Sequence, residues 1–327
     1  LQGSSGSLYL TDFQGNVLNA STSGFSANGI TFDSDPDTTA FDPVSIPSLT
    51  INTPQQGLSF QDVSGVLDVG MLDVTTTAGR AIFVDNFTPF NGALSQGLLF
   101  RATDGSVSAS GAEALSLKTL STNLNFSSFT STNSTDTGIS LTEVADTLTI
   151  SGATIANATN SAISIAQSDM NVTLSGAVSQ GNGNGKLLEL SNIMGGSFDF
   201  SGTNFTADGT ASGISMFNSV QGAVTLGNVN IGQGTPLTND GVTVSDNTGG
   251  SLTINNLNVN TSNGSGIQAS STAPSPFTLG VQGGTIAVDG LGRSALNLSN
   301  INTNINLADV TVNDVGLAGN GLAFNSI

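Results

Sequence analysis

The chain has 327 residues, with 5 Lys and Arg against 23 Asp and Glu, so its formal net charge is −18 at pH 7. It contains no His, Cys or Trp. These counts exclude a Ser-His-Asp triad, a cysteine nucleophile, a disulfide and a zinc finger. The negative charge argues against a surface that neutralises phosphates, so we expect no nucleic acid as a partner.

Apolar runs are short, which argues against a membrane helix. The longest runs, such as Ala81-Ile82-Phe83-Val84, contain about four residues, whereas a membrane helix needs about 20. We therefore expect no membrane insertion of this segment. Apolar residues make up 37% of the chain and charged residues only 9%, the reverse of a disordered composition, so a folded protein is predicted.

Residues 1–28 are expected to form an incomplete first turn at the N-terminal edge. Leu8 and Leu10 alternate like the inward pair of a strand, and no matching strand precedes them. From residue 29 to 327 the sequence repeats, and we expect one solenoid domain there. The units begin near Gly29, Gly57, Ala81, Ala114, Gly138, Ala162, Leu187, Gly213, Gly241, Gly266, Ala295 and Gly321.

Each unit contains short strands in which apolar and polar residues alternate. Ile139 and Leu141 open one unit, and Ile163 and Ile165 occupy the same positions in the next. Spacing of two residues is strand periodicity with one buried face, and the bounding Gly, Asn, Ser and Asp residues are typical of turns. Three short strands per unit of roughly 24–29 residues predict an all-β, right-handed, single-stranded parallel β-helix of about twelve turns.

This repeat pattern resembles bacterial secreted right-handed parallel β-helix proteins. It is similar to the passenger regions of autotransporter adhesins, within the broad pectate-lyase-like solenoid class. The resemblance covers Gly29 to Ile327 and rests on the repeat pattern, not on a family motif. It implies an extracellular or outer-surface location, as part of a larger exported bacterial protein.

Two corner insertions are expected, near residues 33–48 and 85–97. In ordinary units the step from the last inward residue of the first strand to the first inward residue of the second is seven or eight residues. This step is 17 residues from Phe32 to Leu49, and it is 14 residues in the third unit. Insertions at one corner of a solenoid are common binding segments, so both are candidate contact sites.

The first insertion is rich in aspartate, which predicts a calcium site. Alternating carboxylates can converge on a hard cation, although the glycine and the distal glutamate of a complete calcium loop are missing. The alternative is a solvated acidic turn. The candidate Ca²⁺ ligands are Asp33, Asp35, Asp37 and Asp42.

Three phenylalanines in the same two insertions are candidate binding residues: Phe41, Phe87 and Phe90. They would either form an apolar contact patch for a partner or pack the insertions onto the rod.

Outward positions also align from unit to unit. We predict one column made of Thr149, Thr173, Thr225, Thr253 and Thr278, interrupted by Asp199. An ice-ordering face would need regular threonine columns side by side on a flat sheet. One interrupted column is therefore interpreted as ordinary solvated β surface.

The function predicted from these features is a non-catalytic adhesin or structural stalk that presents loops to a surface protein or glycan of a host or neighbouring cell. One alternative is a polysaccharide-active lyase or glycoside hydrolase, although Arg80, Arg101, Lys118, Lys186 and Arg293 form no recognisable lyase constellation. Another is a filament subunit that associates end to end, because residues 321–324 form a first strand with no second strand after it.

Overall fold

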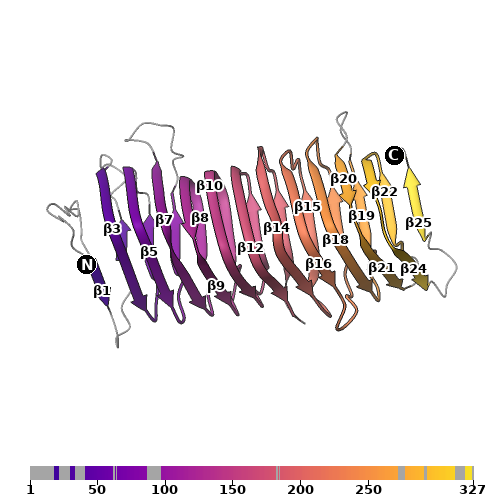
Figure 1. Ribbon diagram of the computed structural model, residues 1–327, viewed down its shortest axis with the longest axis horizontal. Helices are drawn as coiled ribbons and strands as arrows, with labels where there is room; N and C mark the ends of the chain where they lie inside the picture. The colour runs from indigo at the N-terminus through magenta and orange to yellow at the C-terminus, as the bar shows by residue number, and fades with distance from the viewer. Residues whose placement is uncertain are drawn as a thin grey trace.

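The computed structural model describes residues 18–21, 30–33, 41–61, 63, 65–86, 97–181, 183, 185–271, 277–290, 293–313 and 321–325, with side chains from residue 45 onward. All regular structure in these ranges is β, and 25 strands join into one sheet that coils on itself. Figure 1 shows the coils stacked into an elongated rod, with β1 at one end and β25 at the other. No helix capable of crossing a membrane is found among the described residues.

Each coil has a first, a second and a third strand, and each strand pairs in parallel with its counterpart in the next coil. The first-strand column contains β2 (Ile30–Asp33), β4 (Leu58–Gln61), β6 (Ile82–Asp85), the start of β8 (Leu115–Phe126), the start of β10 (Ile139–Ala156), β11 (Ser161–Ala166), β13 (Lys186–Ser191), β15 (Ser212–Phe217), β17 (Val242–Ser245), β19 (Ile267–Ser270), β22 (Leu296–Ser299) and β25 (Leu322–Asn325).

The second and third strands of a coil are often continuous. They are formed by β3 (Phe41–Thr53), β5 (Gly65–Thr76), β7 (Leu98–Ser110), the end of β8, β9 (Ser128–Thr132), the rest of β10, β12 (Asp169–Gln180), β14 (Gly195–Ala207), β16 (Ala223–Ile231), β18 (Ser251–Thr261), β20 (Thr278–Val281), β21 (Gly284–Asp289), β23 (Asn302–Ile305) and β24 (Asp309–Asn313). At the N-terminal end β1 (Leu18–Ser21) pairs with the third-strand part of β3. The predicted parallel β-helix is thus confirmed, with about ten full turns where the sequence suggested twelve units.

The core is one continuous column of inward side chains. Ile139 pairs with Ile163 and Leu141 pairs with Ile165, as the alternation predicted, and all four are buried. Because the same position of every coil points inward, each coil covers the apolar side chains of the next. Burial of this kind contributes roughly 25 cal/mol to the free energy of folding for each Å² of apolar surface removed from water.

The first insertion is shorter than the sequence suggested, because β3 already begins at Phe41. Val44 pairs with Leu67 in the second-strand column, whereas Leu49, predicted to lie in that column, pairs with Leu72 in the third. Residues 41–48 are therefore strand, not insertion. The prediction missed this because it placed the second strand by its apolar pair alone, at Leu49 and Ile51. Prolines occupy positions 43 and 47 of this strand. A register shift between Phe41 and Val44 accommodates the first of them, as bulges allow.

Left-handed residues turn the chain at the corner between the first and second strands in most coils, and Asn218 is followed there by a second one, Ser219. The φ angles there lie between 51° and 58° at Thr119, Glu143, Gln167, Asn192, Asn218, Asp246 and Asn300. Polar side chains, above all Asn and Asp, tolerate this conformation better than apolar ones. From Thr119 to Asp246 these residues recur once per coil, and Asn300 follows two coils later, so they form a column of their own.

Glycine is required where neighbouring coils approach most closely. Gly176 has a φ of +136°, and a Cβ at this position would collide with the Ala153 backbone of the coil before. Gly183 has a φ of +86°, but a Cβ there would meet no atom within 4 Å.

We expect Gly176→Ala to lower the free energy of unfolding by about 1–3 kcal/mol more than Gly183→Ala, because only the first adds a steric collision to the strain of a positive φ. Urea unfolding followed by circular dichroism measures both variants. Equal losses in the two variants would contradict the close coil-to-coil approach at Gly176.

Candidate binding groove

A shallow groove crosses the second-strand parts of β3, β5, β7 and β8, near the N-terminal end of the rod. Its volume is about 470 Å³. It is lined by Ser45, Ile46, Pro47, Asp68, Val69, Gly70, Arg101, Ala102, Thr103, Asn123 and Asn125. These residues come from four successive coils, so the groove runs along the axis of the rod.

An outward glycine and a buried alanine lie at the bottom of this groove. Gly70 has no side chain, and a Cβ there would collide with the carbonyl oxygen of Pro47, so the backbones of β3 and β5 touch closely. Ala102 is buried and occupies the register position next to Val69. The floor is consequently apolar, while the outward residues on either side form polar walls.

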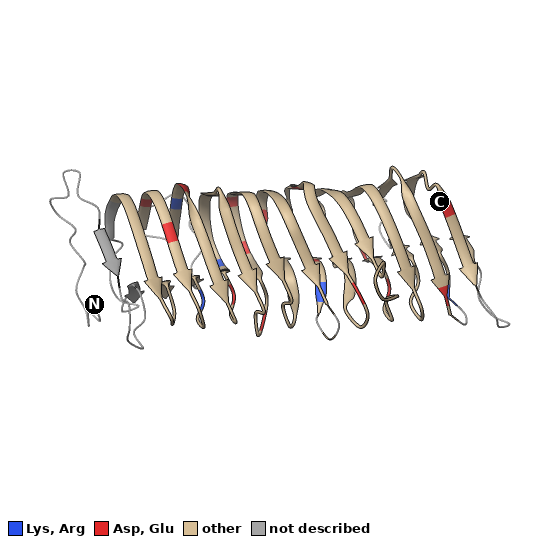
Figure 2. Cartoon of the chain, turned by 60° about the horizontal axis from the view of Figure 1, so that its bottom comes forward, with Lys and Arg blue, Asp and Glu red and all other residues tan. Residues whose placement is uncertain are grey.

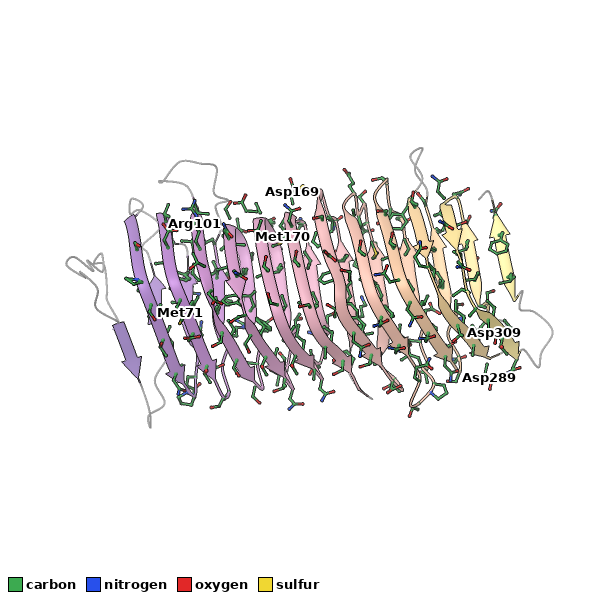
Figure 3. The ribbon with its side chains drawn as sticks, in the orientation of Figure 1. Met71, Arg101, Asp169, Met170, Asp289 and Asp309 are labelled. Atoms are coloured by element: carbon green, nitrogen blue, oxygen red, sulfur yellow. The ribbon has the colours of Figure 1, made fainter. Side chains whose placement is uncertain are left out.

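One wall carries an ion pair between adjacent coils. The Nη1 atom of Arg101 lies 3.3 Å from Oδ1 of Asp68, and the two side chains are 45% and 42% exposed. The pair follows directly from the register, because Asp68 and Arg101 are Cα partners in β5 and β7. Exposed pairs of this type contribute at most about 1 kcal/mol to stability, so the pair shapes the groove more than it stabilises the fold. Figure 3 labels Arg101 on this part of the rod.

The other polar groups of the groove are held by hydrogen bonds. The Thr103 hydroxyl donates to the carbonyl oxygen of Gly70, and the Asn125 side-chain NH₂ donates to the carbonyl of Thr103 at 3.1 Å. Thr147 donates its hydroxyl proton to the Asn123 side-chain oxygen at 2.9 Å. These bonds fix the amides in place, so the groove presents preorganised donors and acceptors to a polar ligand.

The groove lining contains a single carboxylate. Glycoside hydrolysis requires two carboxyl groups that flank one bond, and the lining contributes one, Asp68, which is paired to Arg101. Within the described ranges there is no cluster of three or more His, Cys, Asp or Glu side chains able to hold a metal ion.

Other cations also pair with carboxylates across coils. Arg80 lies 2.6 Å from Glu113, and Lys118 lies 2.9 Å from Asp85. Each of these pairs, like Asp68 with Arg101, is separated by 33 residues, the length of the long third coil. Figure 2 shows that most of the strand ribbon is uncharged and that many charged segments lie at the turns.

Burial perturbs the Glu113 carboxyl group. Its side chain is 5% exposed, and desolvation raises its pKa above the ordinary value, while the Arg80 guanidinium opposes the shift. A further rise comes from the negative charge of Asp136 in the next coil. Arg80 also stacks on the Phe83 ring, 4.6 Å from its centre. We interpret this cluster as a structural corner, because its carboxylate is already paired.

The structure describes the side chain of none of the predicted site residues. Strands contain Asp33, Phe41 and Asp42, but their side chains are not described, and the other four fall outside the described residues. These four are Asp35, Asp37, Phe87 and Phe90. The calcium site and the aromatic contact patch therefore stay predictions.

The structure also reveals buried polar residues that the alternation did not predict. Asn247 is fully buried, and its side-chain oxygen accepts a hydrogen bond from the Val220 backbone N–H at 2.7 Å. The Ser168 hydroxyl oxygen likewise accepts a hydrogen bond from the Val144 backbone N–H at 3.1 Å. Both residues come shortly after a left-handed corner residue, where strand alternation is interrupted and gives no signal.

Comparison with protein-family models, with curated proteins and with solved structures found no match. The arguments for function therefore rest on the fold and on the groove.

Burial of Glu113 makes stability depend on pH. A carboxyl whose folded pKa is raised holds its proton in the folded state at pH values where the unfolded chain has released it. Stability from this group is therefore present at low pH and is lost as the pH rises from the ordinary glutamate pKa through the folded one. We expect wild-type stability relative to Glu113→Gln to fall over this window, as measured by urea unfolding at a series of pH values. A difference that rises with pH would contradict this.

Proposed function

We propose that the chain is a non-catalytic β-solenoid that acts as an adhesin or stalk on the outside of a bacterial cell. It holds a contact surface at a distance from the cell body, and the groove across β3, β5, β7 and β8 is the contact surface that the described residues offer. The partner is a surface protein or glycan of a host or neighbouring cell.

The observation that carries this proposal is the uninterrupted pairing from coil to coil. Each of the three strand columns continues through the described part of the chain, over a single apolar core. Strands lie about 4.8 Å apart, so ten coils extend over roughly 50 Å. A body in which every coil is bonded to both neighbours resists bending, and this is the mechanical requirement of a stalk.

The surface chemistry also favours presentation. Three of the five cations, Arg80, Arg101 and Lys118, pair with carboxylates across coils. Ion pairs of this kind occupy the cations that a lyase would direct at a uronate. The groove has its charges balanced in the same way and suits a neutral polar ligand.

End-to-end association is the second candidate, and one observation favours it. On β25 the side chains of Leu322 and Phe324 are 51% and 50% exposed. They continue the inward column of Leu296 and Leu298, so a second copy stacked on this end would cover them.

Adhesion of coated beads tests the main proposal. Beads carrying the intact chain should adhere to cultured cells or to an array of cell-surface glycans and proteins. The double variant Arg101→Ala with Asn123→Ala should reduce adhesion several-fold, because it removes two neighbouring polar side chains from one wall of the groove.

The matched control is Ser140→Ala with Ser164→Ala, which are outward partners on the first-strand face. This pair should leave adhesion unchanged. Absence of adhesion to every surface would overturn the adhesin role. Release of new reducing ends from a panel of polysaccharides would overturn the non-catalytic role and favour the enzyme.

A further inference from the structure

The groove combines an apolar floor with polar side chains along both of its long sides. The buried side chains of Ile46, Val69 and Ala102 form the floor, and the residues directly before and after each of them lie on the outward face. A ligand that fits this groove therefore needs apolar faces and polar edges. One wall contains Ser45, Asp68, Arg101 and Asn123, which are successive Cα partners, and the other contains Pro47, Thr103 and Asn125.

The first wall presents donors together with a carboxylate acceptor. Within the described part of the chain, the ion pair engages one nitrogen of Arg101 and one oxygen of Asp68. A guanidinium has five N–H donors and a carboxylate has two oxygens, so both groups have capacity left for a ligand. The Asn123 side-chain oxygen accepts from Thr147, which leaves its NH₂ group as a further donor of this wall.

The second wall presents acceptors. The Thr103 hydroxyl donates its proton to the carbonyl oxygen of Gly70, so the hydroxyl oxygen is left to accept. The Asn125 NH₂ group donates to the carbonyl oxygen of Thr103 at 3.1 Å, which holds the amide in place and leaves its oxygen to accept. A ligand in this groove must therefore accept hydrogen bonds along one edge and donate them along the other, as well as donate to Asp68.

Hydroxyl groups satisfy this pattern, because each one can both donate and accept. A sugar ring carries hydroxyls along its edges and C–H groups on its faces. A ring that lies flat in the groove places its C–H groups on the apolar floor and its hydroxyls at both walls. We propose that the groove binds a neutral oligosaccharide whose chain lies along the axis of the rod. This inference rests on the proposed function, in which the same groove is the contact surface.

The charge balance of the groove favours a neutral sugar chain over an acidic one. Asp68 lies in the wall and neutralises Arg101, and the whole chain has a net charge of −18. A uronate carboxylate would be repelled by this field and would have to displace Asp68 from Arg101. A neutral chain meets neither cost.

An extended peptide fits the groove less well than a sugar chain does. Peptides bind to sheets by adding a strand at an edge, where backbone groups are unpaired. The groove lies on the face of the sheet, where β3, β5 and β7 are already paired with each other in register. The groove therefore offers side chains to a ligand, and their spacing follows the coils and not a peptide backbone.

The groove occupies one end of a longer polar column. The sequence placed Thr278 in this column, but Thr278 pairs with Ser251 in the neighbouring column, and Gly280 takes its place. The coils after the groove carry a side chain where β5 has a glycine, so the gap in the second wall is not repeated in them. Beyond Asn125 the column continues in register through Thr149, Thr173, Asp199, Thr225 and Thr253.

Isothermal titration calorimetry of the intact chain tests this inference with short oligosaccharides of glucose, galactose and mannose, and with oligogalacturonate as the charged comparison. The wild type should bind at least one neutral oligosaccharide, with an affinity that added salt leaves unchanged, and should not bind oligogalacturonate. Asp68→Asn should weaken binding of the neutral ligand several-fold, because it removes a charged acceptor. The same variant should gain salt-sensitive binding of oligogalacturonate, because Arg101 loses its carboxylate partner.

The matched control is Asp73→Asn, which makes the same charge change in β5 but on the third-strand face, where Asp73 accepts a hydrogen bond from the Ser106 hydroxyl. It should bind as the wild type does, and thermal melting by circular dichroism shows whether both variants fold. Equal effects in the two variants, or a wild type that prefers oligogalacturonate, would contradict the inference.

Absence of binding to every neutral oligosaccharide would also overturn the inference. Bead adhesion that depends on Arg101 and Asn123 would in that case still support the groove as a contact surface, and would assign it to a protein partner. The failure of the sugar ligand is thus distinguishable from the failure of the adhesin role.

Discussion

The whole structure depends on the stacking of inward side chains in register from one coil to the next. A strand of four residues, such as β4 or β17, buries too little apolar surface to be stable alone. It becomes stable because Leu58 lies between Ile30 and Ile82, with the same arrangement repeated above and below. Stability is then approximately a sum of contacts between neighbouring coils, and the length of the rod follows from the number of units.

The same register that builds the core also organises the surface. An outward residue has as neighbours the residues at the same position one coil away, so charges, amides and hydroxyls form columns. Where a column contains opposite charges, an ion pair results, as between Asp68 and Arg101. Where the column lacks a side chain, as at Gly70, a groove opens. Binding surfaces on this fold are thus made by alignment, and a substitution at one position affects three coils.

The fold could be predicted from sequence because alternation within short strands and the recurrence of units are both local patterns. Ile139 and Ile163 show the two patterns together. The details of register were harder to predict, because choosing the second strand of a coil by its apolar pair alone is ambiguous when the third strand has a similar pair. This is why Leu49 was assigned to the second column, although it pairs with Leu72 in the third.

The groove was not predicted, because its residues lie in different units and none belongs to a motif. One signal was available in the sequence: Asp68 and Arg101 are separated by 33 residues, the length of the long coil between them. Aligning charges by unit length would have found this pair and also the pair of Arg80 with Glu113. The inward Asn247 gives no comparable signal, because it follows a left-handed corner that breaks the alternation.

Disulfide trapping tests the register between coils most directly, since the natural chain has no cysteine. Ser140 and Ser164 are Cα partners in adjacent coils, and strands about 4.8 Å apart lie within the range that a disulfide can bridge. We expect Ser140→Cys with Ser164→Cys to form an intramolecular disulfide rapidly under mild oxidation, and Ser140→Cys with Ala166→Cys, two residues out of register, to form it far more slowly. Preferential crosslinking of the second pair would contradict the stacking on which this account is built.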